Sequence, residues 1–225
     1  MIIWSEEVRT RIPGLHLTLG IVKNVRVGPP TKRNQEIYNR IISTIKEKYT
    51  LENLKNDPVI RAYRDFYWHY LKIDPTKIRP AGEALIRRIL SGKSIPSISN
   101  VVDAYNVASI ETKISLGAYD YDLLKLPLHV RFAKSGEKFK PIGKSETQLT
   151  GKELVIADEE KIICLYPHRD SDKTKVNPNT HNVLILGYGV PNLDDEIVFN
   201  AVKIACNYIL EVTGGNIEKI EKHII

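Results

Sequence analysis

The sequence has few cysteines and no long apolar run. Its two cysteines, Cys164 and Cys206, lie in an apolar stretch and in a helical pattern, where small buried hydrophobic residues are expected. Two well-separated thiols do not form a metal site, and a disulfide between them is an alternative that a reducing compartment disfavours. No apolar run approaches the ~20 residues that a membrane span needs. The N-terminal residues MIIWSEEVRTRIPG carry charges where a signal peptide is apolar. We therefore expect a soluble cytoplasmic protein without membrane contact.

The common signatures of nucleotide, metal and hydrolase sites are also missing. The sequence contains neither GxxxxGK[ST] nor GxGxxG between a strand and a helix, and it lacks HExxH, CxxC and GxSxG. The six histidines are scattered along the chain. These absences predict a protein without a metal site or a cofactor, and they exclude the ATP-binding machinery of a complete tRNA ligase.

The composition is that of a globular protein with a basic surplus. The chain has 225 residues, of which 42% are hydrophobic and 27% charged, so it can bury a substantial core. The net charge of +6 favours an anionic partner such as RNA. Many basic cytoplasmic proteins have no such partner, however, so the charge alone is weak support.

Helical patterns dominate the first half of the chain and strand patterns the second half. Apolar residues recur at helical spacing in four segments: residues 35–49, 58–71, 80–90 and 101–112. Alternating or continuous apolar runs indicate strands at 126–133 and 181–189 and a hairpin over 151–167. A late helix follows Asp194 and Asp195. Residues 15–27 indicate one strand or a hairpin, and the last ten residues fit a strand or a short helix. This order predicts an α+β fold.

Three polar clusters interrupt these structural patterns. The first, at residues 79–83, contains Arg79 and Glu83 at the start of a helix. The second combines Asp103 and Asn106 with the segment SLGAYDYD at 115–122, and the third is HRDSDKTK at 168–175. Each cluster alone is also typical of a solvated helix face or of a loop held by side-chain to backbone hydrogen bonds.

Taken in order, the clusters resemble a known family. The stretches NVVDAYN, GAYD and RDSDKTKV, with RPAGEALIRR before them, are similar to the B3/B4 domain of the phenylalanyl-tRNA synthetase β subunit and of small free-standing proteins. The resemblance covers about residues 79–189, and a helical extension at about 31–72 matches the free-standing type more loosely. It implies a single B3/B4-type domain over 1–225, with a mixed sheet or sandwich core flanked by helices.

The resemblance also implies an activity. In synthetases this domain holds an editing site that hydrolyses a wrong amino acid from tRNA, and free-standing relatives resemble deacylases that act in trans. The alternatives are a non-catalytic RNA-binding module associated with a synthetase, and a protein that binds a small amino-acid-like ligand without RNA.

Hydrolysis of an aminoacyl ester needs a positioned water, a donor for the developing oxyanion and an anchor for the ammonium group, and no strong nucleophile. We expect Asp120 and Asp172 to offer carboxylates and His168 to carry a proton. Asn106 and Thr174 are expected to contact the aminoacyl or ribose groups. Arg79 and Glu83 form either part of this pocket or a structural pair.

Basic residues near these clusters are candidates for contacts with tRNA phosphates. They are Lys173 and Lys175 beside the expected pocket, and Arg87 and Arg88 on the helix at 80–90. Phosphate contacts of this kind weaken steeply as the salt concentration rises. From the sequence we expect the three clusters to meet around one amino-acid-sized hollow, which would be the editing site.

Overall fold

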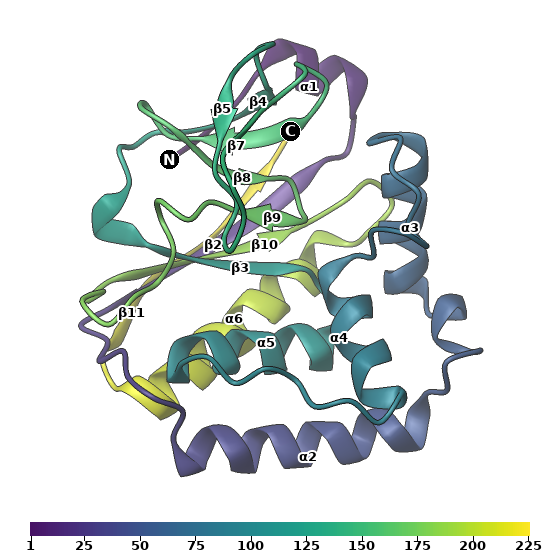
Figure 1. Cartoon of the computed structure of the whole chain (residues 1–225), viewed down its shortest axis with the longest axis vertical. Helices are drawn as coiled ribbons and strands as arrows, with labels where there is room; N and C mark the ends of the chain where they lie inside the picture. The colour runs from purple at the N-terminus through teal and green to yellow at the C-terminus, as the bar shows by residue number, and fades with distance from the viewer.

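The computed structural model describes residues 1–225 and has the α+β architecture that the sequence predicts. Two β-sheets lie one above the other, and helices cover the outer face of the lower sheet (Figure 1). Tyr119 of the lower sheet also forms an isolated bridge with Lys175, in the segment that follows the last strand of the upper sheet. None of the helices has the length and apolar character that crossing a membrane requires.

The lower sheet has four antiparallel strands in the order β11-β2-β10-β3. Their bounds are His16–Lys23 for β2, Leu116–Asp120 for β3, Val183–Tyr188 for β10 and Asn216–Ile224 for β11. The central strands β2 and β10 are almost completely buried, which explains their continuous apolar sequence. Residues 15–27 thus form one strand and not a hairpin, and the ambiguous C-terminal residues form an edge strand.

The upper sheet has five strands in the order β1-β4-β7-β8-β9. They are β1 Ile2–Trp4, β4 Leu128–Phe132, β7 Leu154–Ala157, β8 Ile162–Leu165 and β9 Arg169–Asp170. Strand β1 pairs with β4 in parallel, and the other pairs are antiparallel. The predicted hairpin at 151–167 is confirmed as β7–β8. A separate hairpin is formed by β5 Lys138–Phe139 and β6 Thr147–Gln148.

Every helix except α4 begins after a residue whose side chain caps its first turn. The helices are α1 Glu6–Arg11, α2 Lys32–Lys48, α3 Pro58–His69, α4 Ala81–Leu90, α5 Asn100–Thr112 and α6 Asp195–Thr213. Short 3-10 turns occur at Leu54–Asn56 and Tyr121–Leu123. Asp57, Ser99 and Asp194 each accept a hydrogen bond from the first turn of the following helix, which satisfies otherwise free N–H groups.

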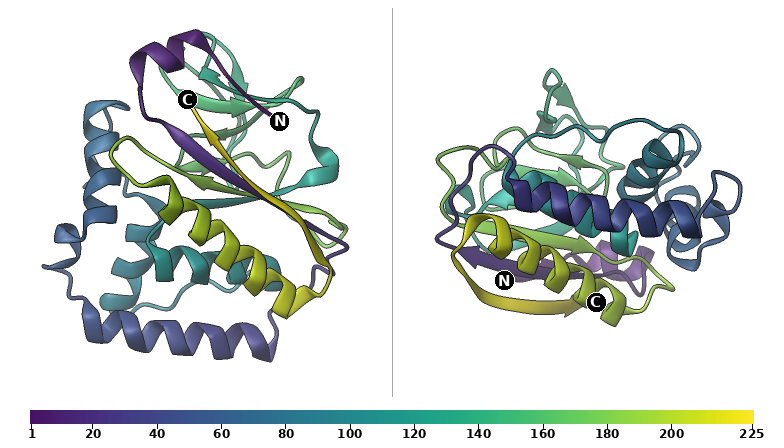
Figure 2. Two further views of the ribbon diagram at one scale, coloured as in Figure 1. Left: turned by 180° about the vertical axis from the view of Figure 1, so that it is seen from behind. Right: turned by 90° about the horizontal axis from the view of Figure 1, so that it is seen from below.

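The helices differ in what they cover. Helices α5 and α6 lie under the lower sheet, and α2 runs across the bottom of the molecule (Figure 2). Helices α3 and α4 stand at one end of the sheets (Figure 1). The main hydrophobic core fills the space between these layers, and a small second cluster lies beneath the β5–β6 hairpin. The end of the molecule where α3 and α4 meet β9 is therefore the place where polar side chains from distant segments come together.

Candidate functional site

The carboxylate of Glu83 on α4 lies at the centre of a buried ionic group. Its side chain is 0% exposed, and its Oε1 accepts hydrogen bonds from Arg64 on α3 at 2.9 Å and from Arg87 on α4 at 2.7 Å. One of the two roles considered for Arg79 and Glu83, a structural ion pair between them, is wrong. Glu83 pairs with Arg64 and Arg87 instead, and Arg79 is exposed. The second oxygen, Oε2, is buried without a hydrogen-bond partner.

A second buried polar atom without a partner belongs to Tyr67 on the inner face of α3. Its hydroxyl accepts and donates no hydrogen bond, and its ring lies edge-on to the imidazole of His168 with the centroids 6.0 Å apart. Burial raises the pKa of Tyr67, and the nearby charges of Arg169 and Glu83 also act on this pKa. Tyr67 on α3 therefore lies beside the segment leading into β9 and within electrostatic reach of Glu83 on α4.

The imidazole of His168 is neutral in this environment. Burial, together with the positive charge of Arg169, lowers the pKa of His168 to about 4. Its Nδ1 atom is buried without a partner. A neutral imidazole nitrogen that carries no proton accepts hydrogen bonds, so His168 is suited to hold a water or a donor group of a ligand.

Ser115, just before β3, adds a fourth atom of this kind. Its Oγ is buried without a partner, while its backbone N–H donates to the hydroxyl of Tyr63 at 3.1 Å. Tyr63 lies one turn before Tyr67 on α3. We call Tyr67, Glu83, Ser115 and His168 the α3–β9 cluster. Native proteins rarely leave buried polar atoms unpaired, and such atoms commonly hold water or a ligand.

Tyr119, Asp170 and Tyr188 form a hydrogen-bonded group between the two sheets, and Asp170 lies two residues after His168 of the cluster. The hydroxyl of Tyr119 on β3 donates to Asp170 on β9 and also pairs with the hydroxyl of Tyr188 on β10. Burial raises the pKa of Asp170 to about 6, an effect that the two hydroxyls partly offset. A Cβ atom on Gly117 would lie 2.7 Å from both hydroxyls, so glycine is required there.

The two predicted catalytic aspartates, Asp120 and Asp172, form contacts that hold the 171–182 segment in place. Asp120 is buried and accepts hydrogen bonds from Thr180 at 2.6 Å and from Asn177 at 3.3 Å. Asp172 forms ion pairs with Lys175 at 2.6 Å and Lys140 at 3.0 Å. Hydrogen bonds from these two lysines lower the pKa of Asp172. Both carboxylates thus fasten the 171–182 segment, Asp120 to β3 and Asp172 to the β5–β6 hairpin.

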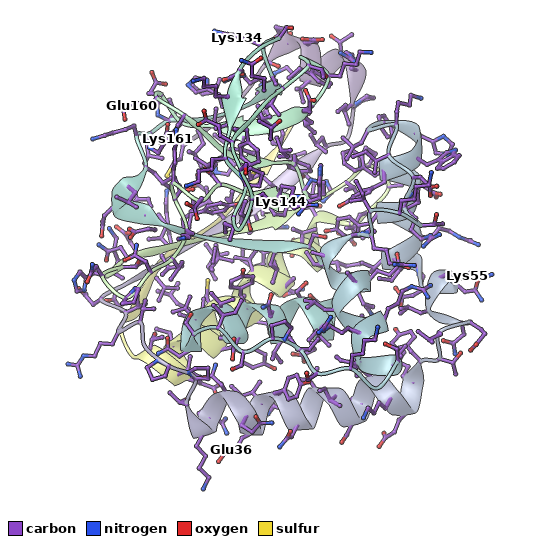
Figure 3. All side chains as sticks on the ribbon, viewed as in Figure 1. Glu36, Lys55, Lys134, Lys144, Glu160 and Lys161 are labelled. Carbon is purple, nitrogen blue, oxygen red and sulfur yellow. The ribbon has the colours of Figure 1, made fainter.

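Asn106 faces a different part of the molecule. It lines a cavity of about 80 Å³ between α2 and α5, together with Asn34, Tyr38, Pro96 and Asp103. Asp172 instead borders an open hollow beside Lys140 and Lys144. Figure 3 shows Lys144 near the middle of the view. The expectation that Asn106, Asp120 and Asp172 surround one hollow is therefore wrong, because helix α5 turns Asn106 toward α2.

Comparison with known proteins identifies the fold. The sequence profile of the B3/4 domain matches residues 62–214. The chain belongs to the B3/4 domain family. It is 26% identical over 177 residues to the phenylalanine–tRNA ligase β subunit of Fusobacterium nucleatum, covering 68% of this chain and 22% of that protein. The β subunit of Carboxydothermus hydrogenoformans is 35% identical over 114 residues, covering 50% of this chain and 14% of the relative. This B3/4 domain thus spans about a fifth or less of the length of these curated relatives.

A solved structure shares this fold. It is an N-terminal fragment of the phenylalanyl-tRNA synthetase β subunit from Pyrococcus horikoshii, with a TM-score of 0.51 and 16% sequence identity. The likeness covers 99% of this chain and 53% of that fragment. The structural likeness therefore takes in helix α2 and all of helix α3, whereas the family profile begins within α3.

The remaining predicted site residues of this B3/4 domain differ in whether their side chains already have hydrogen-bond or ion-pair partners. Thr174 is fully buried, and its Oγ1 has no partner. Arg87 is committed to Glu83, while the guanidinium of Arg88 donates to the carbonyl of Ser94 at 2.5 Å. Lys173 is exposed and forms no ion pair. No group of three or more histidine, cysteine or acidic side chains is arranged to hold a metal ion.

Sequence reasoning missed several residues of this region. The sequence pattern places Tyr67 in the apolar stripe of its helix and Tyr188 in a buried strand, so both are predicted as core, whereas Tyr119 lies in the second polar cluster without a predicted role. The available signal is that these positions carry tyrosine and not phenylalanine, since a buried hydroxyl needs a partner. Arg169 and Asp170 lay within the third cluster, but nothing in the sequence distinguished their roles.

Proposed function

We propose that this B3/4 domain is an ester hydrolase that removes the amino acid from mischarged aminoacyl-tRNA, acting in trans on tRNA released by a synthetase. The family relationship to phenylalanyl-tRNA synthetase β subunits supports the tRNA substrate. The observation that carries the proposal is the α3–β9 cluster, where unpaired buried atoms of both acceptor and donor character come from α3, α4, β3 and the start of β9.

The reaction requires little more than positioning. A water oxygen attacks the ester carbonyl, the bond from the carbonyl carbon to the ribose oxygen breaks, and a proton passes to the departing ribose oxygen. Glu83 Oε2 and His168 Nδ1 are acceptors for the water or for the substrate ammonium. The hydroxyls of Tyr67 and Ser115 are donors for the developing oxyanion. Positioning of this kind contributes up to ~7–11 kcal/mol in favourable cases.

His168 has a defined role in this proposal. With its pKa lowered to about 4, the imidazole stays neutral at neutral pH and is a weak base. It therefore orients the water, and the neighbouring ribose hydroxyl of the terminal adenosine assists in moving the proton. Asp120 and Asp172 then support the site by holding the 171–182 segment in place.

The decisive experiment compares Tyr67→Phe and Ser115→Ala with the wild type on a panel of mischarged tRNAs. Each substitution removes one hydroxyl that has no partner in the fold, so we expect unchanged or higher stability in urea. Deacylation is expected to fall by about 10²- to 10³-fold, the effect of losing one oxyanion donor. Tyr38→Phe, beside Asn106 in the separate cavity, is the matched control and should retain full activity.

Three other outcomes contradict the proposal in different ways. Deacylation that is unaffected by both substitutions would place the reaction elsewhere in the molecule. Salt-sensitive RNA binding without hydrolysis would indicate a non-catalytic module, with Lys173, Lys175 and Arg88 as candidates for phosphate contacts. Binding of a free amino acid without RNA binding would indicate a small-ligand protein.

A further inference from the structure

Trp68 on α3 is an exposed aromatic residue in an otherwise well-packed helix. Its side chain is 56% exposed, while the preceding residues Phe66 and Tyr67 are buried and the other tryptophan, Trp4, is 7% exposed. A large aromatic side chain left in water commonly marks a contact surface. Trp68 therefore requires an explanation beyond core packing.

The indole borders an open hollow. Trp68, His69, Lys72 and Asp74 line this hollow, whose volume is about 370 Å³. The Asp74 carboxylate is occupied by the N–H and hydroxyl of Thr76, at 2.8 and 2.7 Å. Lys72 holds a left-handed backbone with φ of 55°, which is unfavourable for a non-glycine residue. The hollow thus presents one free aromatic face and one free cation.

The chain segment that contains the residues of the hollow is basic. Residues 61–79 contain two acidic residues, Asp65 and Asp74, and five basic residues, which are Arg61, Arg64, Lys72, Lys77 and Arg79. Arg64 is bound to Glu83, whereas the other four basic residues are exposed. None of these four takes part in an ion pair. Free cations beside an exposed aromatic ring are the combination that single-stranded nucleic acid binding uses.

We propose that Trp68 stacks on a base of the single-stranded 3′ end of the tRNA, and that Lys72, Lys77 and Arg79 contact the flanking phosphates. This inference rests on the proposed function for the identity of the RNA. Tyr67 precedes Trp68 and is buried on the inner face of the same helix, so a strand held at Trp68 lies against the helix that carries part of the α3–β9 cluster. Trp68 would thereby guide the aminoacyl end toward the site.

The test uses the full chain and a short single-stranded oligoribonucleotide ending in CCA. Because Trp4 is buried, fluorescence quenching by acrylamide reports mainly on Trp68. We expect the oligonucleotide to change this fluorescence and to protect the indole from acrylamide. Trp68→Ala should weaken binding in a polarisation assay about ten- to hundredfold, and Trp68→Phe should recover most of the affinity, because stacking needs an aromatic face.

Matched controls separate stacking from general effects. Ile98→Ala removes another exposed apolar side chain, 65% exposed, and Lys55→Ala removes a cation at the edge of the molecule (Figure 3). Both should bind like the wild type, whereas Lys72→Ala should bind more weakly and with a smaller dependence on salt. Equal affinity of Trp68→Ala and wild type would overturn the inference, as would equal competition by duplex RNA without a single-stranded end.

The outcomes also distinguish this inference from the proposed function. If the wild type deacylates tRNA and Trp68→Ala does so at the same substrate affinity, stacking at Trp68 is refuted and editing stands. If the oligonucleotide binds through Trp68 but no mischarged tRNA is hydrolysed, editing is refuted and the RNA contact stands. Loss of a protein partner in Trp68→Ala with RNA binding intact would refute the RNA contact.

Discussion

His168 and Asp170 are half-buried residues that lie two positions apart in the chain. Their shifted pKa values predict opposite responses of stability to pH. Burial lowers the pKa of His168 from 6.5 to about 4. Burial raises the pKa of Asp170 from 3.8 to about 6. The folded protein therefore resists protonation of His168 and retains the proton of Asp170 more strongly than the unfolded chain does.

The signs and sizes follow from proton linkage. Between pH 6.5 and 4 the unfolded chain takes up a proton at His168 that the folded protein refuses, so the free energy of unfolding falls as pH falls, by about 3 kcal/mol in total. Between pH 3.8 and 6 the folded protein holds the Asp170 proton, so this contribution is complete below 3.8 and is lost as pH rises through 6. It also amounts to about 3 kcal/mol. In the wild type the two effects nearly cancel.

Urea unfolding at pH 4, 5, 6 and 7 tests this balance with His168→Gln and Asp170→Asn. Differences from the wild type remove the contribution of all other groups. As pH falls from 7 to 4, we expect His168→Gln to gain about 3 kcal/mol relative to the wild type and Asp170→Asn to lose a similar amount. The double variant should run parallel to the wild type. Parallel curves for both single variants would refute the reasoning.

Three further substitutions test other contacts. Gly117→Ala should cost about 1–3 kcal/mol in urea unfolding, because the added methyl overlaps buried hydroxyls, whereas Gly28→Ala meets no atom within 4 Å and should be nearly neutral. Glu83→Gln should lower the free energy of unfolding by several kcal/mol because it leaves two arginines uncompensated, up to ~3–5 kcal/mol. Glu7→Gln, in an exposed pair, should change it by less than about 1 kcal/mol. Asp120→Ala should speed proteolytic cleavage within 171–182, and an unchanged cleavage rate would contradict its anchoring role.

Much of the fold was predictable because its signals are local. Helical spacing and capping residues such as Ser99 and Asp194 act within a few positions of one another, and the predicted helices lie where the structure has them. Continuous apolar runs located β10 and the β7–β8 hairpin. Helix α1 and the short strands β1 and β9 escaped prediction, since two to six residues give too short a pattern and are stabilised mainly by their neighbours.

The candidate site was predictable only in part. Glu83 and His168 were identified as polar residues in otherwise structural segments, and both belong to the α3–β9 cluster. The structure does not bring Asp120 and Asn106 into this cluster. The direction in which a side chain faces depends on how helices and strands pack, and the sequence pattern does not contain this information. The sequence supplied no means to see that Arg64, and not Arg79, reaches Glu83.

The sequence by itself determined the family, the α+β class and the order of helices and strands, because these follow from residue patterns that act over short distances. Only the tertiary structure decided which polar groups meet. A carboxylate on α4, a phenol on α3 and an imidazole before β9 become neighbours through long-range packing of helices against two sheets. The same packing removes water from them, and this burial shifts the pKa values of His168 and Asp170 in opposite directions.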